Sequence, residues 1–187
     1  TVEAEMSPTK TGFVLQLPSL VRRESLVRLD FRSTVYQNRT RFDAFLGNSN
    51  MGDQVRQFVD AGNASTEVAS ESISVQLPIN GDLVANLALS TSILTPNGDG
   101  IGDQIEISFD ALKLVVPRPI RVQVFDLAGR KVRTLPSGNG LAQRYNFTWD
   151  GRDERSRLVP PGTYFVQVAI EGDSQSKRAH RMLPVLY

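Results

Sequence analysis

The sequence predicts an all-β protein with two immunoglobulin-like antiparallel β-sandwich domains in tandem. Apolar and polar residues alternate with a period of two along most of the 187 residues, which is the pattern of strands with one buried and one solvated face. Turn-forming residues recur roughly every eight to twelve residues, a spacing typical of antiparallel sandwiches. No window shows a convincing helical stripe of apolar residues.

The first ninety residues contain several short alternating segments, in which polar turns such as 47–50 and 80–82 separate the apolar runs. The longest of these segments, residues 26–35, places Val27, Leu29 and Phe31 on one face. We expect five or more strands in this half, including strands at residues 13–17, 26–35, 42–46 and 73–77.

The second half repeats this pattern with stronger signals. Residues 120–135 place a turn at Ala128-Gly129 between two alternating runs, which predicts a β-hairpin. The rigid turn Pro160-Pro161-Gly162 precedes another strict alternation. We expect the other strands of this half at residues 105–110, 145–149, 164–170 and 179–186.

The chain length favours two domains of about ninety residues over one large sandwich. We place the boundary between residues 90 and 91, which gives an N-terminal β-sandwich domain at 1–90 and a C-terminal immunoglobulin-like domain at 91–187. Residues 1–11 lack the alternation of the rest, so they are expected to form either a linker or a strand donated to a neighbouring molecule.

Composition excludes several classes of function. Lys plus Arg is 21 and Asp plus Glu is 20, so no global field attracts nucleic acid or an anionic membrane. No apolar stretch reaches the length of a membrane span. The absence of cysteine excludes thiolate metal sites and cysteine nucleophiles, and the single histidine, His180, excludes a site with several histidine ligands.

The most specific segment is Thr95-Pro96-Asn97-Gly98-Asp99-Gly100-Ile101-Gly102-Asp103. Oxygen atoms from four of these residues form a candidate structural Ca²⁺ site: Asn97, Asp99 and Asp103 through their side chains and Ile101 through its carbonyl. The alternative is a metal-free turn in which the Asn and Asp side chains bond to their own backbone. The spacing alone leaves both interpretations open.

The same segment opens a series of motifs that resembles the gliding-motility-associated, type IX secretion C-terminal domains and the immunoglobulin-like domain of flagellar hook-capping proteins. The motifs are residues 94–100, the hairpin at 122–135 with its Asp126-Leu127-Ala128-Gly129-Arg130 turn, the strand and turn at 147–153, and the Pro-Pro-Gly turn and strand at 159–165. They occur in the family's order and cover about residues 93–187. The sequence departs from the family pattern at Gly102 and Arg157.

This resemblance implies a non-enzymatic extracellular module of a bacterial surface or secreted protein. Such a module serves anchoring, sorting or assembly through sheet edges and loops, and its partners are proteins on the cell surface or neighbouring copies of itself. One alternative is a filament or surface-layer subunit that polymerises by strand donation. A second alternative is a carbohydrate-binding module, in which Trp149, Tyr145 and Phe147 would form a sugar-stacking platform.

Four other candidate residues have a structural interpretation that we favour. Trp149 shares its parity with Tyr145 and Phe147, which favours a place in the core. Asp150 and Asp153 flank a turn, so turn chemistry is favoured over a pair of catalytic carboxylates or a contribution to the cation site. His180 is expected to be a surface residue on an edge strand.

Overall fold

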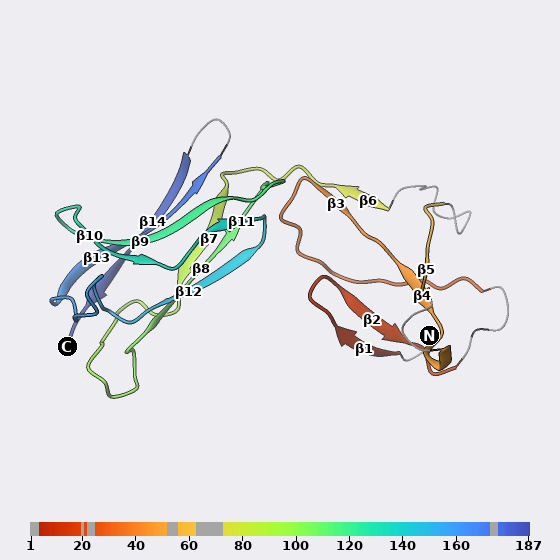
Figure 1. Ribbon diagram of the computed structural model, residues 1–187, viewed down its shortest axis with the longest axis horizontal. Coiled ribbons are helices and arrows are strands. Elements are labelled where there is room, and N and C mark those ends of the chain that lie inside the picture. The colour runs from red at the N-terminus through yellow and green to blue at the C-terminus, as the bar shows by residue number, and fades with distance from the viewer. Residues whose placement is uncertain (1–3, 20, 22–24, 52–55, 63–72, 173–175) are drawn as a thin grey trace. The chain divides into compact units, whose positions relative to one another are not determined.

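The computed structural model describes residues 4–19, 21, 25–51, 56–62, 73–172 and 176–187 (Figure 1). In this part of the chain the regular elements are β-strands and one short 3-10 turn, η1 (Ser49–Met51), and the sheets are antiparallel. The all-β prediction is therefore confirmed. Backbone contacts divide the chain into an N-terminal unit, Thr1–Ser33 with Arg41–Val75, and a C-terminal unit, Thr34–Thr40 with Gln76–Tyr187.

The sheets formed by residues 1–76 have two strands each. Strand β1 (Glu5–Pro8) pairs with β2 (Phe13–Gln16), β3 (Arg39–Arg41) with β6 (Ser74–Gln76), and β4 (Phe45–Gly47) with β5 (Arg56–Phe58). Aromatic rings provide local packing, with Phe31 in edge contact with Phe13 and Phe42 at centroid distances of 5.5 and 5.6 Å. None of the described residues of the N-terminal unit is buried.

The strand predicted at residues 26–35 is absent, and that prediction was wrong. The segment is extended chain without a described strand beside it, and Val27, Leu29 and Phe31 remain 54%, 53% and 52% exposed. The alternation is present in the sequence, but it needs a neighbouring strand to bond its backbone and a second layer to cover its apolar face.

The described residues 4–11 include a strand and the start of a tight turn. Strand β1 pairs within the chain, with Glu5 opposite Gln16 and Pro8 opposite Phe13. Thr9 closes the hairpin by donating its N–H to the Gly12 carbonyl at 2.9 Å. Residues 5–8 therefore form a strand within their own chain, and strand donation to a neighbouring molecule stays a prediction. Residues 1–3 lie outside the described residues.

The C-terminal unit consists of a five-stranded and a three-stranded sheet. The larger sheet has the order β10 (Lys131–Leu135), β9 (Arg118–Asp126), β13 (Gly162–Glu171) and β14 (Ser176–Val185), with β11 (Asn139–Gly140) paired to β9. The smaller sheet has the order β12 (Arg144–Trp149), β8 (Ile105–Ala111) and β7 (Val84–Leu89). Each strand that the sequence predicts between residues 105 and 186 is present, including the hairpin at 120–135.

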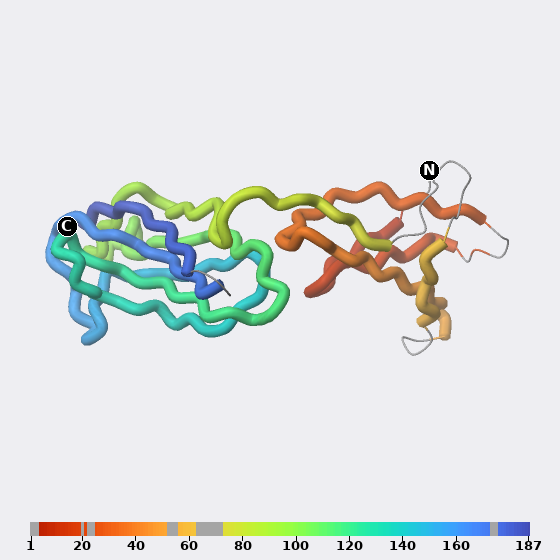
Figure 2. The backbone as a smooth tube through the Cα atoms, turned by 90° about the horizontal axis from the view of Figure 1, so that it is seen from above, coloured from red at the N-terminus to blue at the C-terminus, as the bar shows by residue number. Residues whose placement is uncertain are grey.

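The two sheets share one hydrophobic core. Alternate residues of each central strand are buried, because successive side chains of a strand point to opposite faces and one of those faces lies between the two sheets. Figure 2 shows the strands of this unit running side by side. Strand β8 contributes Ile105, Ile107 and Phe109, and the facing sheet contributes residues such as Val122, Val124, Val166 and Val168. Trp149 and Leu94 complete the core at one end, at 1% and 0% exposure.

The division between the units lies earlier than the predicted boundary at residues 90/91. Strand β7 precedes that boundary, yet it pairs with β8, so its residues complete the smaller sheet of the C-terminal unit. Residues 34–40 also join this unit. The Lys113 N–H donates to the Tyr36 carbonyl at 2.8 Å, and the Gln37 amide donates to the Leu114 carbonyl at 3.2 Å. Two immunoglobulin-like sandwiches in tandem stay a prediction.

Candidate functional site at the loop end of the C-terminal unit

The strand registers bring the motif-bearing connections to one end of the C-terminal unit. Ile105 opens β8 opposite Trp149, which closes β12. On the other sheet, Gly162 opens β13 opposite Val185, which closes β14, and Asp126 closes β9 opposite Tyr164. We call this region the loop end: residues 90–104, 127–130 and 150–161 with residues 186–187. All four motifs of the sequence therefore converge on it.

The side chain of Trp149 holds the turn that follows it in place. The indole N–H of Trp149 donates to the Arg152 carbonyl at 2.9 Å, and the Val159 N–H donates to the Gly151 carbonyl at 2.9 Å. Gly151 has a φ of 71°, and a Cβ at this position would lie 2.9 Å from Cγ of Pro96. Glycine is therefore required both by the backbone conformation and by the close contact between two of the motif loops. The prediction that Trp149 lies in the core is confirmed.

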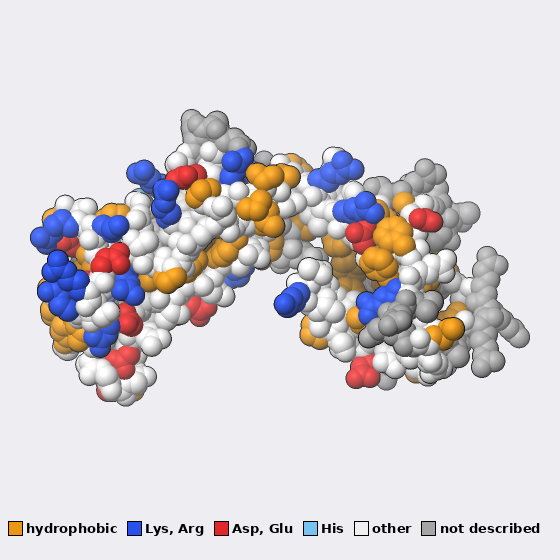
Figure 3. Space-filling model, in the orientation of Figure 1, with side chains coloured by type: hydrophobic (Ala, Val, Ile, Leu, Met, Phe, Trp, Pro, Cys, Tyr) orange, Lys and Arg blue, Asp and Glu red, His pale blue; other side chains and the backbone are white. Residues whose placement is uncertain are grey.

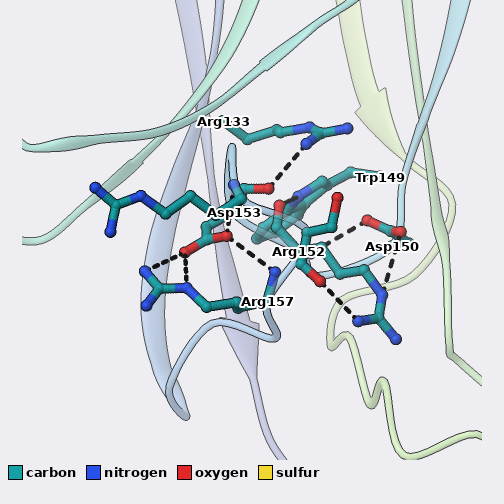
Figure 4. A network of polar contacts seen from close by, with 8 residues as sticks. Arg133, Trp149, Asp150, Arg152, Asp153 and Arg157 are labelled. Atoms are coloured by element: carbon teal, nitrogen blue, oxygen red, sulfur yellow. Dashed lines mark hydrogen bonds and ion pairs between the residues drawn. The ribbon is translucent and has the colours of Figure 1, made fainter.

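Asp153 holds the 150–161 loop together (Figure 4). Its carboxylate accepts the N–H of Arg155 at 2.8 Å and the N–H of Arg157 at 3.0 Å, and it pairs with the Arg157 guanidinium at 2.9 Å. The Arg157 N–H is the main reason that the pKa of Asp153 is lowered from its usual value. Asp150 accepts the Arg152 N–H at 3.2 Å. Both carboxylates thus serve the turn, as favoured from the sequence.

The loop also covers the free edge of β10. The Glu154 N–H donates to the Val132 carbonyl at 3.1 Å, and the Glu154 carboxylate accepts the Thr134 N–H at 2.8 Å. Arg133 adds a bond from its guanidinium to the Asp153 carbonyl at 2.8 Å (Figure 4). Sequence reasoning missed Glu154 and Arg133, because no local pattern indicates that two segments twenty residues apart will lie side by side.

The hairpin turn of β9 and β10 carries a similar carboxylate. Asp126 accepts the N–H of Arg130 at 2.9 Å and pairs with its guanidinium at 2.8 Å. The backbone bond is the largest cause of the lowered pKa of Asp126. Asp126 and Asp153 therefore play equivalent roles in two of the motif turns, each with an arginine four residues later.

The 95–103 loop brings together the four residues predicted to bind Ca²⁺. Asp103 accepts the N–H groups of Gly98 and Gly100, each at 2.7 Å. Asn97 accepts the Asp99 N–H at 3.0 Å, and Asp99 accepts the Ile101 N–H at 2.7 Å. The Ile101 carbonyl accepts the Thr95 hydroxyl at 3.0 Å. These bonds account for the spacing of the Asn and Asp residues as turn chemistry, and calcium binding stays a prediction.

The C-terminal residues of the chain bond to the same loops. Leu94 pairs with Val185, and the Leu186 N–H donates to the Leu94 carbonyl at 2.9 Å. The Tyr187 hydroxyl donates to the Val159 carbonyl. A shallow hollow of ≈ 370 Å³ lies here, lined by Pro96, Asn97, Leu158, Val159, Pro160 and Tyr187.

The other candidates lie where the sequence favoured them. His180 is exposed on β14, at the edge of the five-stranded sheet. Trp149 is too deeply buried to serve as a sugar platform, although Tyr145 and Phe147 are only partly buried. Within the described ranges, no three or more His, Cys, Asp or Glu residues form a group suited to a metal ion, and no helix is long and apolar enough to span a membrane.

Comparisons with solved structures find distant likenesses. Dimeric latent PorU from Porphyromonas gingivalis is 12% identical with a TM-score of 0.46, covering 62% of this chain and 11% of PorU. FlgD from P. aeruginosa is 25% identical with a TM-score of 0.38, covering 56% of this chain and 76% of FlgD. PorZ, a type IX secretion component of Porphyromonas gingivalis, is 19% identical with a TM-score of 0.33, covering 54% of this chain and 11% of PorZ. No curated protein matches the chain.

The family comparison is decisive. Residues 88–183, just over half of the chain, match the CHU_C type IX secretion signal domain. The matched range contains all four sequence motifs and strands β8 to β13, with most of β14. The chain therefore belongs to the type IX secretion signal domain family, whose members direct proteins to the cell surface or outside the cell.

Proposed function

We propose that the C-terminal unit is a non-catalytic sorting signal. We further propose that protein components of the secretion route bind to its loop end. The observation that carries this proposal is the convergence of the four family motifs on one end of the sandwich. A contact surface needs its residues side by side, and the strand registers bring the four motif connections together in this way.

The loop end has the properties of a preorganised contact surface. Its turns are fixed by backbone bonds to Asp103, Asp126 and Asp153, so little conformational entropy remains to be lost on binding. Two apolar side chains stand at its loop tips, Ile101 with 76% and Leu127 with 67% of the residue exposed. A protein partner would remove this apolar surface from water.

Charged side chains of both signs surround these tips. Arg130 and Arg157 each pair with an aspartate of their own turn, and their side chains remain 82% and 66% exposed. Figure 3 shows Lys, Arg, Asp and Glu side chains interspersed at the end of the C-terminal unit. Mixed charge of this kind suits a specific protein contact better than a uniformly charged or membrane surface.

The necessity of the unit is tested by deleting residues 76–187 from the protein as its host produces it. We expect the shortened protein to be lost from the cell surface and the medium and to accumulate inside the envelope, as measured by surface protease accessibility and fractionation. Unchanged export of the shortened protein would refute the sorting role.

The location of the contact surface is tested by two matched substitutions in the full chain. Leu127→Asp changes an exposed residue of the loop end, and Val115→Asp changes an even more exposed residue of the β8–β9 connection at the opposite end. We expect export to fall roughly tenfold or more with Leu127→Asp, as for loss of a contact worth about 1.4 kcal/mol, and to be unchanged with Val115→Asp. Equal effects would refute the assignment of the loop end.

We also propose that the 95–103 loop binds Ca²⁺ through Asn97, Asp99, Ile101 and Asp103. The support is chemical: these residues supply the hard oxygen donors that Ca²⁺ prefers, and an oxygen that accepts one N–H bond keeps a second lone pair. Bound calcium would stiffen the loop that packs against Gly151.

A further inference from the structure

Three of the four outer edges of the C-terminal sandwich are protected against pairing with another strand. Glu154 bonds to the backbone of β10. On β7, the Leu87 carbonyl accepts the Arg181 guanidinium at 3.1 Å, and the strand carries a register shift between Ala85 and Ala88. Strand β14 contains Lys177 and Pro184, and the Leu94 N–H donates to the Pro184 carbonyl at 3.0 Å. These devices are the usual ways in which proteins prevent edge-to-edge association.

The fourth edge, β12, has no such protection among the described residues. Strand β12 pairs on one side with β8, in continuous register from Arg144 opposite Asp110 to Trp149 opposite Ile105. The segment from 144 to 149 contains no proline, glycine, lysine or register shift. It is six residues long, enough for several ladder bonds.

The register shows which backbone groups of β12 face outward. The Ala111 N–H donates to the Gln143 carbonyl at 2.9 Å, so residues 143 and 111 form a hydrogen-bonded pair. Because such pairs alternate in an antiparallel ladder, residues 145, 147 and 149 also bond to β8. The N–H and carbonyl groups of Arg144, Asn146 and Thr148 therefore point away from the sheet.

The side chains of these three residues leave the edge open. All three are exposed. Arg144 bends back over its own sheet, with one guanidinium nitrogen 3.4 Å from the Asp110 carboxylate and the other bonded to the Ser108 hydroxyl at 3.1 Å. Its charge is held by the buried Asp110 and does not shield the edge.

We propose that β12 pairs antiparallel with β12 of a second copy of this chain, with the two-fold axis at Asn146. In this register all three outward-facing residues form ladder bonds: Asn146 pairs with its own counterpart, and Arg144 pairs with the partner's Thr148. Moving the two-fold axis from Asn146 to Phe147 would place Arg144 opposite position 150 of the partner, which lies beyond the end of the strand.

The side chains are self-complementary in this register. Arg144 faces a neutral threonine, so no like charges are opposed. On the inner face, Tyr145 lies opposite the partner's Phe147. These two rings already stack with Phe109 in one copy, at centroid distances of 5.6 Å for Tyr145 and 6.0 Å for Phe147, and they are only partly buried. Cross-strand aromatic pairs stabilise sheets, and the partner would cover these rings.

The resulting assembly is closed. The two smaller sheets join into one sheet of six strands, and the isologous contact leaves no further β12 edge for a third copy. A contact of one strand on each side is small, so we expect a weak dimer of the kind formed by interfaces below roughly 1,200 Å². It is a dimer contact and differs from polymerisation by strand donation.

The experiment uses single-cysteine variants of the full chain, which has no native cysteine. In a hydrogen-bonded antiparallel pair the Cα atoms are about 5.5 Å apart, within the range of a disulfide, so Asn146→Cys is expected to link two copies under mild oxidation. In the control, Thr148→Cys, the two thiols lie four residues apart along the strands, about 13 Å, beyond disulfide reach.

We expect covalent dimers to form roughly tenfold or more faster with Asn146→Cys than with Thr148→Cys, because pairing raises the effective concentration of the thiols. Equal rates, or no covalent dimer, would overturn the proposal.

A second variant blocks the edge. The Asn146 N–H faces outward, so Asn146→Pro removes a donor to the partner without removing a bond to β8. We expect it to abolish the concentration-dependent dimer of the unsubstituted chain in sedimentation velocity. A monomer at every concentration before substitution, or a dimer that persists in a folded Asn146→Pro variant, would also overturn the proposal. If Asn146→Pro does not fold, the comparison of Asn146→Cys with Thr148→Cys still tests the proposal.

Discussion

The two units of this chain share an alternating sequence pattern but differ in what the alternation buries. In the C-terminal unit, the inward residues of β8, β9 and β13 meet across two sheets and are excluded from water. In the described residues of the N-terminal unit, the same kind of pattern belongs to two-stranded pairs or to unpaired extended chain. Alternation therefore fixes which face of a strand is apolar, but a second layer decides whether that face becomes a core.

The largest expected difference between the units concerns their phenylalanines. Phe109 is fully buried and Phe31 is 52% exposed. We expect Phe109→Ala to lower the free energy of unfolding of the C-terminal unit by about 3–5 kcal/mol, and Phe31→Ala to change it by less than about 0.5 kcal/mol. Denaturant titration followed by the fluorescence of Trp149, the single tryptophan, reports on the C-terminal unit. Similar changes in the free energy of unfolding for the two variants would contradict the difference in burial between the units.

The sequence was most informative where strands are covered on one side. Phe109, Val124 and Val166 each lie on the face and in the strand that the alternation predicts. The failure at residues 26–35 has a physical cause. Val27 and Phe31 satisfy the same rule, but the strand that would bond to their segment is a nonlocal feature that the local pattern does not encode.

The candidate site shows the same limit. The sequence identified the turn roles of Asp150 and Asp153 and the residues of the 95–103 loop, because Asn, Asp and Gly act over a few residues. It did not identify Glu154 against β10 or the contact between Gly151 and Pro96, which depend on how separate connections meet at one end of the sandwich.

A second difference between the units concerns glycine. A Cβ on Gly140 would lie 2.2 Å from the Tyr145 hydroxyl and 2.6 Å from Cδ1 of Ile120, whereas a Cβ on Gly62 of the N-terminal unit would meet nothing within 4 Å. We expect Gly140→Ala to destabilise the C-terminal unit by about 1–3 kcal/mol through overpacking, with little effect of Gly62→Ala. Denaturant midpoints of the two variants provide the measurement. Equal midpoints would show that the region around Gly140 can relax.

A third prediction separates turn chemistry from calcium binding in the 95–103 loop. Without calcium, Asp103→Ala should lower the stability of the C-terminal unit by about 1 kcal/mol, because it leaves the N–H groups of Gly98 and Gly100 without their acceptor. If calcium binds, it should raise the Tm of the unsubstituted chain by mass action, and Asp99→Ala should remove that rise. A Tm that calcium does not change would eliminate the metal site and leave the turn.

The smallest expected effect is a pH dependence. The pKa of Asp153 is lowered in the folded state, mainly by the Arg157 N–H, so its ionised form contributes stability above the unfolded pKa of about 3.9. That contribution is lost as the pH falls through the lower folded pKa. The Tm of the C-terminal unit should therefore decrease on acidification below about pH 4, and Asp153→Asn should make the decrease shallower.

The matched control for this pH dependence is Asp30→Asn. Asp30 pairs with Arg28 in the N-terminal unit, and both side chains are 78% exposed. We expect no change in the acid dependence of the Trp149 signal with this variant. If it flattens the curve as strongly as Asp153→Asn, the acid sensitivity does not arise from the turn.

The most direct test of the account asks whether the unit that has its own core is sufficient for sorting. A passenger protein with its own export signal would carry either residues 76–187, which contain the whole core of the C-terminal unit, or residues 1–75 at its end, in a host with type IX secretion. We predict that the passenger with residues 76–187 reaches the cell surface or the medium, as measured by surface labelling and fractionation, and that the passenger with residues 1–75 stays inside the envelope. Retention of the first passenger, or equal export of both, would contradict the account.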